Sequence, residues 1–111
     1  MAGLACGEPN ILAWDILKNH ASFFLSCPDS LAESGMRLLG APLKGDPQVI
    51  SGESGAIGMG VLKAVMTGAG YKDLRESMGL TKDSVILMFS TEGDTDPDRY
   101  KEIVWGGKQY E

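Results

Sequence analysis

Two polar loops in the sequence combine residue types that could contact a ligand. Glu53 stands in the first, a glycine-rich stretch over residues 52–60 that follows a short apolar run at residues 48–50. Ser90 opens the second, an acidic turn over residues 91–96. Ligands of α/β proteins bind where strands end and helices begin. We therefore expect both loops to border a ligand, with Glu53 as the carboxylate nearest to it.

The glycine-rich stretch is an incomplete anion-binding motif. A strand-to-helix junction offers free backbone N–H groups and the positive end of a helix dipole to an anion. Residues 52–60 lack the Gly-Lys-Ser/Thr of a Walker loop and the glycine spacing of a dinucleotide fingerprint. Gly58 and Gly60 are better explained by close helix packing, which leaves Glu53 without a structural explanation.

The other reactive side chains form no recognisable catalytic or metal-binding set. Asp94, Asp96 and Asp98 match the first ligand positions of a calcium loop. The match then fails, because Arg99 stands where the turn glycine is required. His20, the single histidine, has no partner ligands, and no Gly-x-Ser-x-Gly elbow occurs. We therefore predict no catalytic residue and no metal site in this chain.

Composition excludes several classes of protein. The chain has 111 residues, of which 43% are hydrophobic and 23% charged, with a net charge of -5; this is typical of one globular domain. The acidic balance and the lack of a basic cluster argue against nucleic-acid binding. No segment approaches the roughly 20 apolar residues of a membrane span, and the N-terminus lacks the basic region of a secretory signal. We expect a cytoplasmic protein.

Two cysteines, Cys6 and Cys27, are too few for a disulfide scaffold. We expect two reduced, partly buried thiols. A disulfide between them stays open as an alternative, because both precede helical segments.

Helical and strand-like segments alternate along the chain. Apolar spacing predicts helices over residues 11–21, 31–39, 56–67, 71–78 and 97–104. Short apolar runs predict strands over residues 23–26, 48–50 and 84–90. Asn10 is the expected N-cap of the first helix, Ser30 and Glu33 have the spacing of a capping box, and Pro97 opens the last helix.

The run from Val85 to Phe89 is apolar at every position, which is typical of the middle of a parallel sheet. Strands that alternate with helices indicate an α/β fold. We therefore expect a partial three-layer αβα sheet, with mostly parallel strands and helices on both faces.

Three ordered motifs, at residues 1–10, 50–56 and 90–96, resemble a known enzyme family. Together with the ending at residues 104–108, they are similar to the C-terminal part of the diaminopropionate ammonia-lyase family. These are pyridoxal-phosphate enzymes of the threonine-deaminase-like fold type II. The resemblance covers essentially the whole chain, and it implies that residues 1–111 are a single segment of the large domain.

The resemblance implies three cofactor-binding residues. In fold type II enzymes a Ser or Thr after a late strand hydrogen-bonds the pyridine nitrogen, and Ser90 matches it. Glu53 matches a glutamate near the cofactor ring, and Gly3 matches a glycine beside the bound cofactor or substrate. The sequence reads Ser-Thr-Glu-Gly from Ser90 where threonine deaminases have Ser-Gly-Gly-Asn, so the contacts beyond Ser90 stay open.

The resemblance also implies an activity: α,β-elimination of 2,3-diaminopropionate to pyruvate and ammonia, by a homo-oligomer (a homodimer) with pyridoxal 5'-phosphate. The family's Schiff-base lysine and phosphate-binding loop lie in an N-terminal portion that this sequence does not include. None of its lysines occupies a matching context: Lys18, Lys44, Lys63, Lys72, Lys82, Lys101 and Lys108. We therefore expect a fragment that is inactive alone. Two alternatives are a stand-alone, non-catalytic binding or self-association module and a fragment of a threonine- or serine-dehydratase-like enzyme.

Overall fold

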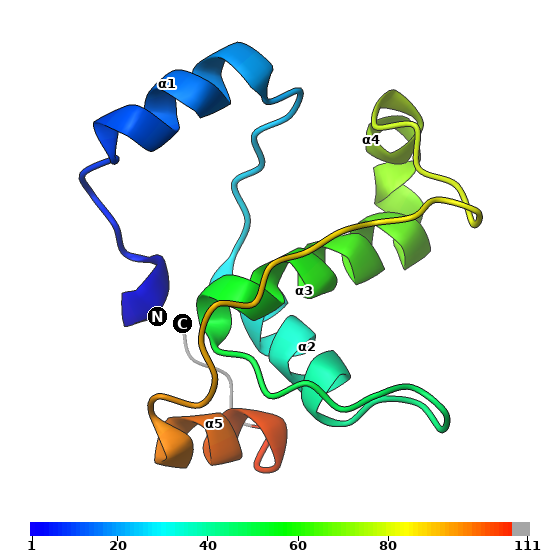
Figure 1. The fold of residues 1–111 in the computed structure, drawn as a ribbon. Helices are drawn as coiled ribbons and strands as arrows, with labels where there is room; N and C mark the ends of the chain where they lie inside the picture. The colour runs from blue at the N-terminus through cyan, green and yellow to red at the C-terminus, as the bar shows by residue number, and fades with distance from the viewer. Residues whose placement is uncertain (108–111) are drawn as a thin grey trace.

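Two packed helices form the centre of the part of the chain that the structure describes, residues 1–107. In this computed structural model, α2 (Asp29–Gly40) packs along α3 (Glu53–Thr67), and α5 (Pro97–Val104) contacts α2 (Figure 1). Helix α1 (Ile11–His20) stands apart from the other helices, and α4 (Lys72–Ser77) follows α3 (Figure 1). Among the described residues, no helix has the length and apolar character needed to cross a membrane.

The five predicted helices are confirmed, with shifts at their ends. Asn10 caps α1 as expected, since its side-chain oxygen accepts a hydrogen bond from the Ala13 N–H at 3.0 Å. Pro97 is the first residue of α5, also as expected. Helix α3 begins at Glu53 rather than at residue 56, so Glu53 lies in the first turn of a helix and not in a loop. Two short 3₁₀ turns, η1 (Ala2–Leu4) and η2 (Ala69–Tyr71), complete the elements.

The capping box expected at Ser30 is wrong. Helix α2 begins at Asp29, directly after Pro28, so Ser30 already lies inside the first turn. Glu33 is fully buried, and one of its carboxylate oxygens lies 3.9 Å from Nη2 of Arg37, one turn further along α2. Its carboxylate therefore lies beside a basic side chain of the same helix, and Ser30 is not the N-cap.

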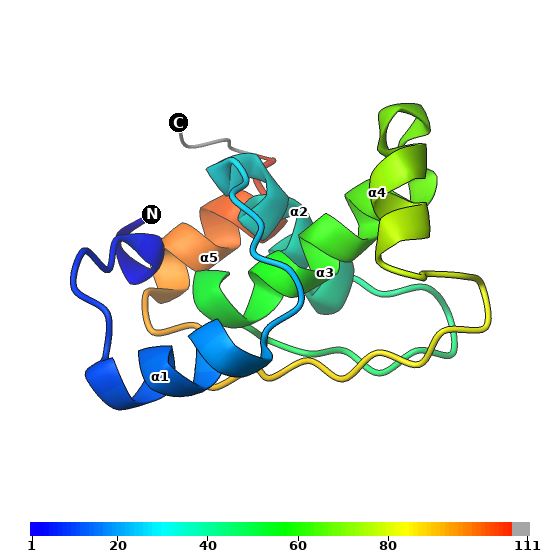
Figure 2. The same cartoon turned by 90° about the horizontal axis from the view of Figure 1, so that it is seen from above.

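The predicted αβα sheet is also wrong, because none of residues 1–107 lies in a β-strand. Residues 23–26, 48–50 and 84–90 lie outside every helix, and the last of them runs along α3 as an extended segment (Figures 1 and 2). A strand also requires a hydrogen-bonded neighbour, and the described part of the chain gives residues 85–89 no backbone hydrogen bond. The apolar pattern specified an extended backbone but not a partner for it.

The backbones of α2 and α3 touch because two glycines face across the contact. A Cβ on Gly35 would lie 1.9 Å from the carbonyl oxygen of Ala56. A Cβ on Gly60 would lie 1.7 Å from the carbonyl oxygen of Leu31. Both distances are far below any real carbon–oxygen contact, so only glycine fits at either position. The expectation that Gly60 serves close helix packing is confirmed.

A small hydrophobic core sits where α2, α3 and α5 meet. Met36, Ala56, Tyr100 and Ile103 form this core, and each of them is buried. Arg37 adds a polar tie, since its Nε donates a hydrogen bond to the Ile103 carbonyl oxygen at 2.8 Å. The glycine contact, the buried core and this hydrogen bond all help to hold the three helices together.

We expect Gly60→Ala to lower the free energy of unfolding by about 1–3 kcal/mol, because the added methyl group must displace the Leu31 carbonyl. Alanine favours a helix over glycine by about 1 kcal/mol, so the measured loss will understate the clash. Urea unfolding followed by circular dichroism gives the value. Gly70→Ala is the matched control, since a Cβ there meets no atom within 4 Å. Equal effects of the two substitutions would contradict the close contact.

Candidate functional site

Gly3 and Glu53, two of the three predicted cofactor-binding residues, meet at the N-terminal end of α3. Glu53 is the first residue of that helix. The next residue, Ser54, donates a hydrogen bond from Oγ to the Gly3 carbonyl oxygen at 3.0 Å. A Cβ on Gly3 would lie 2.9 Å from Oε2 of Glu53. Residue 3 is thus held directly against the Glu53 carboxylate, although fifty positions separate the two in the sequence.

Ser90, the third predicted residue, also lies at this end of α3. Its Oγ donates a hydrogen bond to Oγ of Ser51 at 2.7 Å. Ser51 is fully buried and donates in turn to the Gly52 carbonyl oxygen at 3.1 Å, whereas Ser90 is exposed. Gly55 makes room for this hydroxyl pair, because a Cβ there would lie 2.6 Å from Ser51 Oγ and 2.8 Å from Ser90 Oγ. The pair therefore has one buried and one accessible hydroxyl.

Glu92 is a second carboxylate at this site that the sequence analysis missed. Its carbonyl oxygen accepts a hydrogen bond from the Gly52 N–H at 3.1 Å, which fixes the acidic turn against the start of α3. Its Oε1 would lie 2.8 Å from a Cβ on Gly52 and 3.7 Å from one on Gly3. The sequence could have suggested Glu92, because this residue lies two positions after Ser90 in the turn expected to border a ligand.

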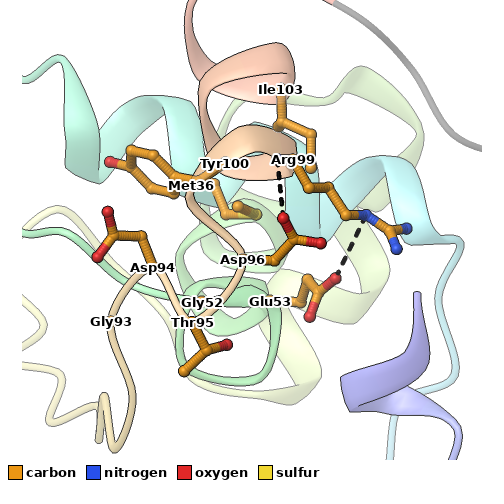
Figure 3. A pocket seen from close by; sticks show the side chains of 10 residues that line it. All are labelled: Met36, Gly52, Glu53, Gly93, Asp94, Thr95, Asp96, Arg99, Tyr100 and Ile103. Atoms are coloured by element: carbon orange, nitrogen blue, oxygen red, sulfur yellow. Dashed lines mark hydrogen bonds and ion pairs between the residues drawn. The ribbon is translucent and has the colours of Figure 1, made fainter.

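Arg99 of α5 forms an ion pair with the Glu53 carboxylate. Its Nε lies 3.8 Å from Oε1 of Glu53, and both side chains are largely buried (Figure 3). Asp96 caps α5 by accepting a hydrogen bond from the Arg99 N–H at 3.1 Å. A cavity of about 30 Å³, lined in part by Glu53, Asp96 and Arg99, lies between these residues. It has room for about one water molecule.

Tyr100 lies beside that cavity and carries a buried hydroxyl with no hydrogen-bond partner in the described part of the chain. Burial, with a smaller contribution from the negative charge of Asp94, raises the pKa of Tyr100 above its ordinary value of 10.0. Figure 3 shows Asp94 on the side of the ring that carries the hydroxyl. Gly40 leaves space for that hydroxyl, since a Cβ there would lie 2.5 Å from it.

The remaining candidates lie away from this site or have structural roles. Asp96 caps a helix and Asp98 lies in the first turn of α5, where a negative charge is favourable. No group of three or more metal-binding side chains occurs within the described residues. His20 is the last residue of the isolated helix α1. Cys6 and Cys27 are free thiols, the first exposed and the second partly buried.

Comparisons with known proteins confirm the resemblance to an ammonia-lyase family. The chain is 58% identical over 108 residues to the diaminopropionate ammonia-lyase of Escherichia coli K12; the match covers 97% of this chain and 27% of that protein. This chain therefore spans about a quarter of the length of that relative. No family model matches the chain.

Solved structures of the Escherichia coli enzyme share the fold. One is its complex with D-serine, and another its complex with an aminoacrylate-PLP azomethine reaction intermediate. Each matches at a TM-score of 0.90 and 58% identity, over 97% of this chain and 28% of the solved chain. The arrangement of helices described above is thus similar to part of a diaminopropionate ammonia-lyase.

We expect Tyr100→Phe to keep or slightly raise the free energy of unfolding at neutral pH, because the lost hydroxyl has no partner. Above pH 10 the unfolded phenol ionises while the folded one keeps its proton, so wild-type stability falls as pH rises. In Tyr100→Phe, the part of the alkaline loss of stability that is due to the Tyr100 phenol should be absent. Urea unfolding from pH 7 to 11 measures it, with the exposed Tyr71→Phe as control. An identical alkaline fall in wild type and Tyr100→Phe would contradict the raised pKa.

Proposed function

We propose that this chain forms part of the cofactor pocket of a pyridoxal-phosphate-dependent ammonia-lyase, which converts 2,3-diaminopropionate to pyruvate and ammonia. The observation that carries the proposal is the convergence of residues 3, 53 and 90 at one end of α3. The similarity to diaminopropionate ammonia-lyases supports it. The proposal includes a place in the C-terminal part of the enzyme, and a cytoplasmic homodimer as its active form.

The hydroxyl pair suits the pyridine nitrogen of pyridoxal phosphate. That nitrogen is a hydrogen-bond acceptor, and Ser90 offers an accessible hydroxyl next to the buried Ser51. A serine hydroxyl both donates and accepts. If Ser90 donates to the ring nitrogen, the bond within the pair reverses, so that Ser51 donates to Ser90 and no longer to the Gly52 carbonyl oxygen. A neutral hydroxyl also leaves the nitrogen unprotonated, which favours elimination over transamination.

Glu53 and Gly3 suit the rim of the same pocket. The Arg99 guanidinium keeps the Glu53 carboxylate at the start of α3. The absence of a side chain at Gly3 leaves that carboxylate the space that a Cβ would otherwise take. In this proposal the carboxylate borders the cofactor ring and Gly3 lies beside the cofactor or the substrate.

When bound, pyridoxal phosphate acts as the electron sink for loss of the Cα proton and the β-amino group, after which water gives pyruvate and two ammonia molecules. The covalent link to the cofactor requires a lysine. Within residues 1–107 every lysine is exposed: Lys18, Lys44, Lys63, Lys72, Lys82 and Lys101. Lys108 lies outside the described residues. This chain thus contributes positioning groups, and the lysine belongs to another part of the enzyme.

The purified chain alone is expected to release no pyruvate from 2,3-diaminopropionate in the presence of pyridoxal phosphate, because it lacks the lysine. A coupled lactate dehydrogenase assay measures the product. Replacing the matching quarter of the Escherichia coli enzyme by this chain should restore the release in the resulting chimera. Turnover of serine or threonine by the chimera, without turnover of 2,3-diaminopropionate, would contradict the proposed substrate.

In the same chimera, Ser90→Ala should weaken pyridoxal phosphate binding about twofold to tenfold, the value of one hydrogen bond of about 0.5–1.5 kcal/mol. Titration of the cofactor's visible absorbance measures the affinity, and the position of the band reports the state of the ring nitrogen. Ser77→Ala is the matched control, because Ser77 ends α4 and is exposed. Unchanged affinity and an unchanged absorbance band in Ser90→Ala would remove Ser90 from the pocket.

A further inference from the structure

Ser51 places a second, fully buried hydroxyl behind Ser90 and forms hydrogen bonds on both of its sides. Its Oγ lies 2.7 Å from Oγ of Ser90 and 3.1 Å from the Gly52 carbonyl oxygen. A hydroxyl has a single proton to donate. In the structure Ser90 donates that proton inward to Ser51, so this orientation leaves Ser90 no proton for an acceptor on its accessible side.

We propose that Ser51 is a positioning residue for pyridoxal phosphate: by rotating its own hydroxyl proton from Gly52 to Ser90, it turns the Ser90 proton toward the pyridine nitrogen. The inference rests on the proposed function and adds a residue buried behind the one that contacts the ring. The rotation costs little, because the Gly52 carbonyl oxygen keeps the hydrogen bond that it accepts from the Ala56 N–H at 3.0 Å. The pair therefore has one hydrogen-bond pattern for the free chain and another for the bound ring.

The other hydrogen-bond partner of the Ser90 side chain in the described part of the chain cannot replace Ser51. This partner is the Glu92 carbonyl oxygen, 3.5 Å from Ser90 Oγ, and a carbonyl accepts hydrogen bonds but donates none. With alanine at position 51, the Glu92 carbonyl would attract the Ser90 proton, and the Ser90 oxygen would lose the donor behind it. An oxygen that a ligand covers without supplying a donor weakens the binding of that ligand.

Gly55 keeps the two hydroxyls close enough for this exchange. It lies in the first turn of α3, where a Cβ would come within 3 Å of both serine Oγ atoms and of the Ser90 Cα. The hydroxyl pair thus rests directly on the helix backbone, and Ser51 is shielded from water that would compete for its proton. In such a setting each hydrogen bond of a chain polarises the next, so donation by Ser51 makes Ser90 a stronger donor.

The test measures cofactor binding to the chimera with the Escherichia coli enzyme by equilibrium dialysis. Two probes are used: pyridoxal phosphate, and its carbocyclic analogue in which a CH group replaces the ring nitrogen. Ser51→Ala should weaken binding of pyridoxal phosphate about twofold to tenfold and binding of the analogue less than about twofold, because the analogue has no acceptor for the Ser90 proton. A purely structural role of Ser51 would weaken both probes equally.

A double-mutant cycle checks that Ser51 acts through Ser90. In the Ser90→Ala background, Ser51→Ala should cause almost no further loss of pyridoxal phosphate affinity. Ser84→Ala is the control, because Ser84 is exposed and its Oγ accepts a hydrogen bond from the Thr81 N–H at 2.8 Å. If Ser51→Ala does not fold, Ser51→Cys takes its place with the same expected results, since a thiol fills the space but is a weak donor.

Three results would overturn the inference: unchanged affinity in Ser51→Ala, equal losses for the two probes, or a loss that is as large in the Ser90→Ala background as in the wild type. Failure of the proposed function gives a different pattern. In that case the wild-type chimera binds no pyridoxal phosphate, or Ser90→Ala itself has no effect, and both proposals fall together. A chimera that responds to Ser90→Ala but not to Ser51→Ala refutes only the role of Ser51.

Discussion

The backbone contact between α2 and α3 is the constraint on which the rest of the structure depends. Gly35 and Gly60 let each helix pack directly against a carbonyl group of the other, so the two axes have little freedom to shift. Few side chains in the described chain are both large and buried, and the hydrophobic core alone therefore offers limited stabilisation. The glycine contact sets the direction of α3, and thereby the place where its N-terminal end, with Glu53, meets the polar loops.

Polar interactions then fix the position of α5 relative to α2 and α3. Glu33, fully buried on α2, lies 3.9 Å from Arg37, and Arg37 donates to the carbonyl oxygen of Ile103. This contact fixes α5 on α2, and α5 in turn brings Arg99 to within 3.8 Å of Glu53. The Glu53 carboxylate is therefore oriented by two helices, its own and α5. A carboxylate held in this way loses little conformational entropy when a ligand binds beside it.

Sequence patterns predicted the helices well because a helix satisfies its own backbone. Asn10 and Pro97 mark helix starts through local chemistry, and both were confirmed. The sheet was a different kind of prediction, because the apolar run from Val85 to Phe89 specifies an extended chain but not the neighbour that would pair with it. The capping box shows a related limit: the spacing of Ser30 and Glu33 suggested a local cap, yet α2 already begins at Asp29, and the buried Glu33 carboxylate lies near Arg37 on the same helix.

The sequence predicted only some of the residues of the candidate site, and there is a physical reason why it missed the others. Gly3, Glu53 and Ser90 were identified from motifs, and the structure brings them to one place, while their role toward a cofactor stays a proposal. Glu92 and Arg99 join them only through the path of the acidic turn and the docking of α5, which no local pattern encodes. The result is a neutral hydroxyl pair beside two carboxylates at the positive end of a helix. That end of a helix attracts negative charge, which suits the two carboxylates placed there, and the serine hydroxyl is the side-chain donor available to a polar ligand.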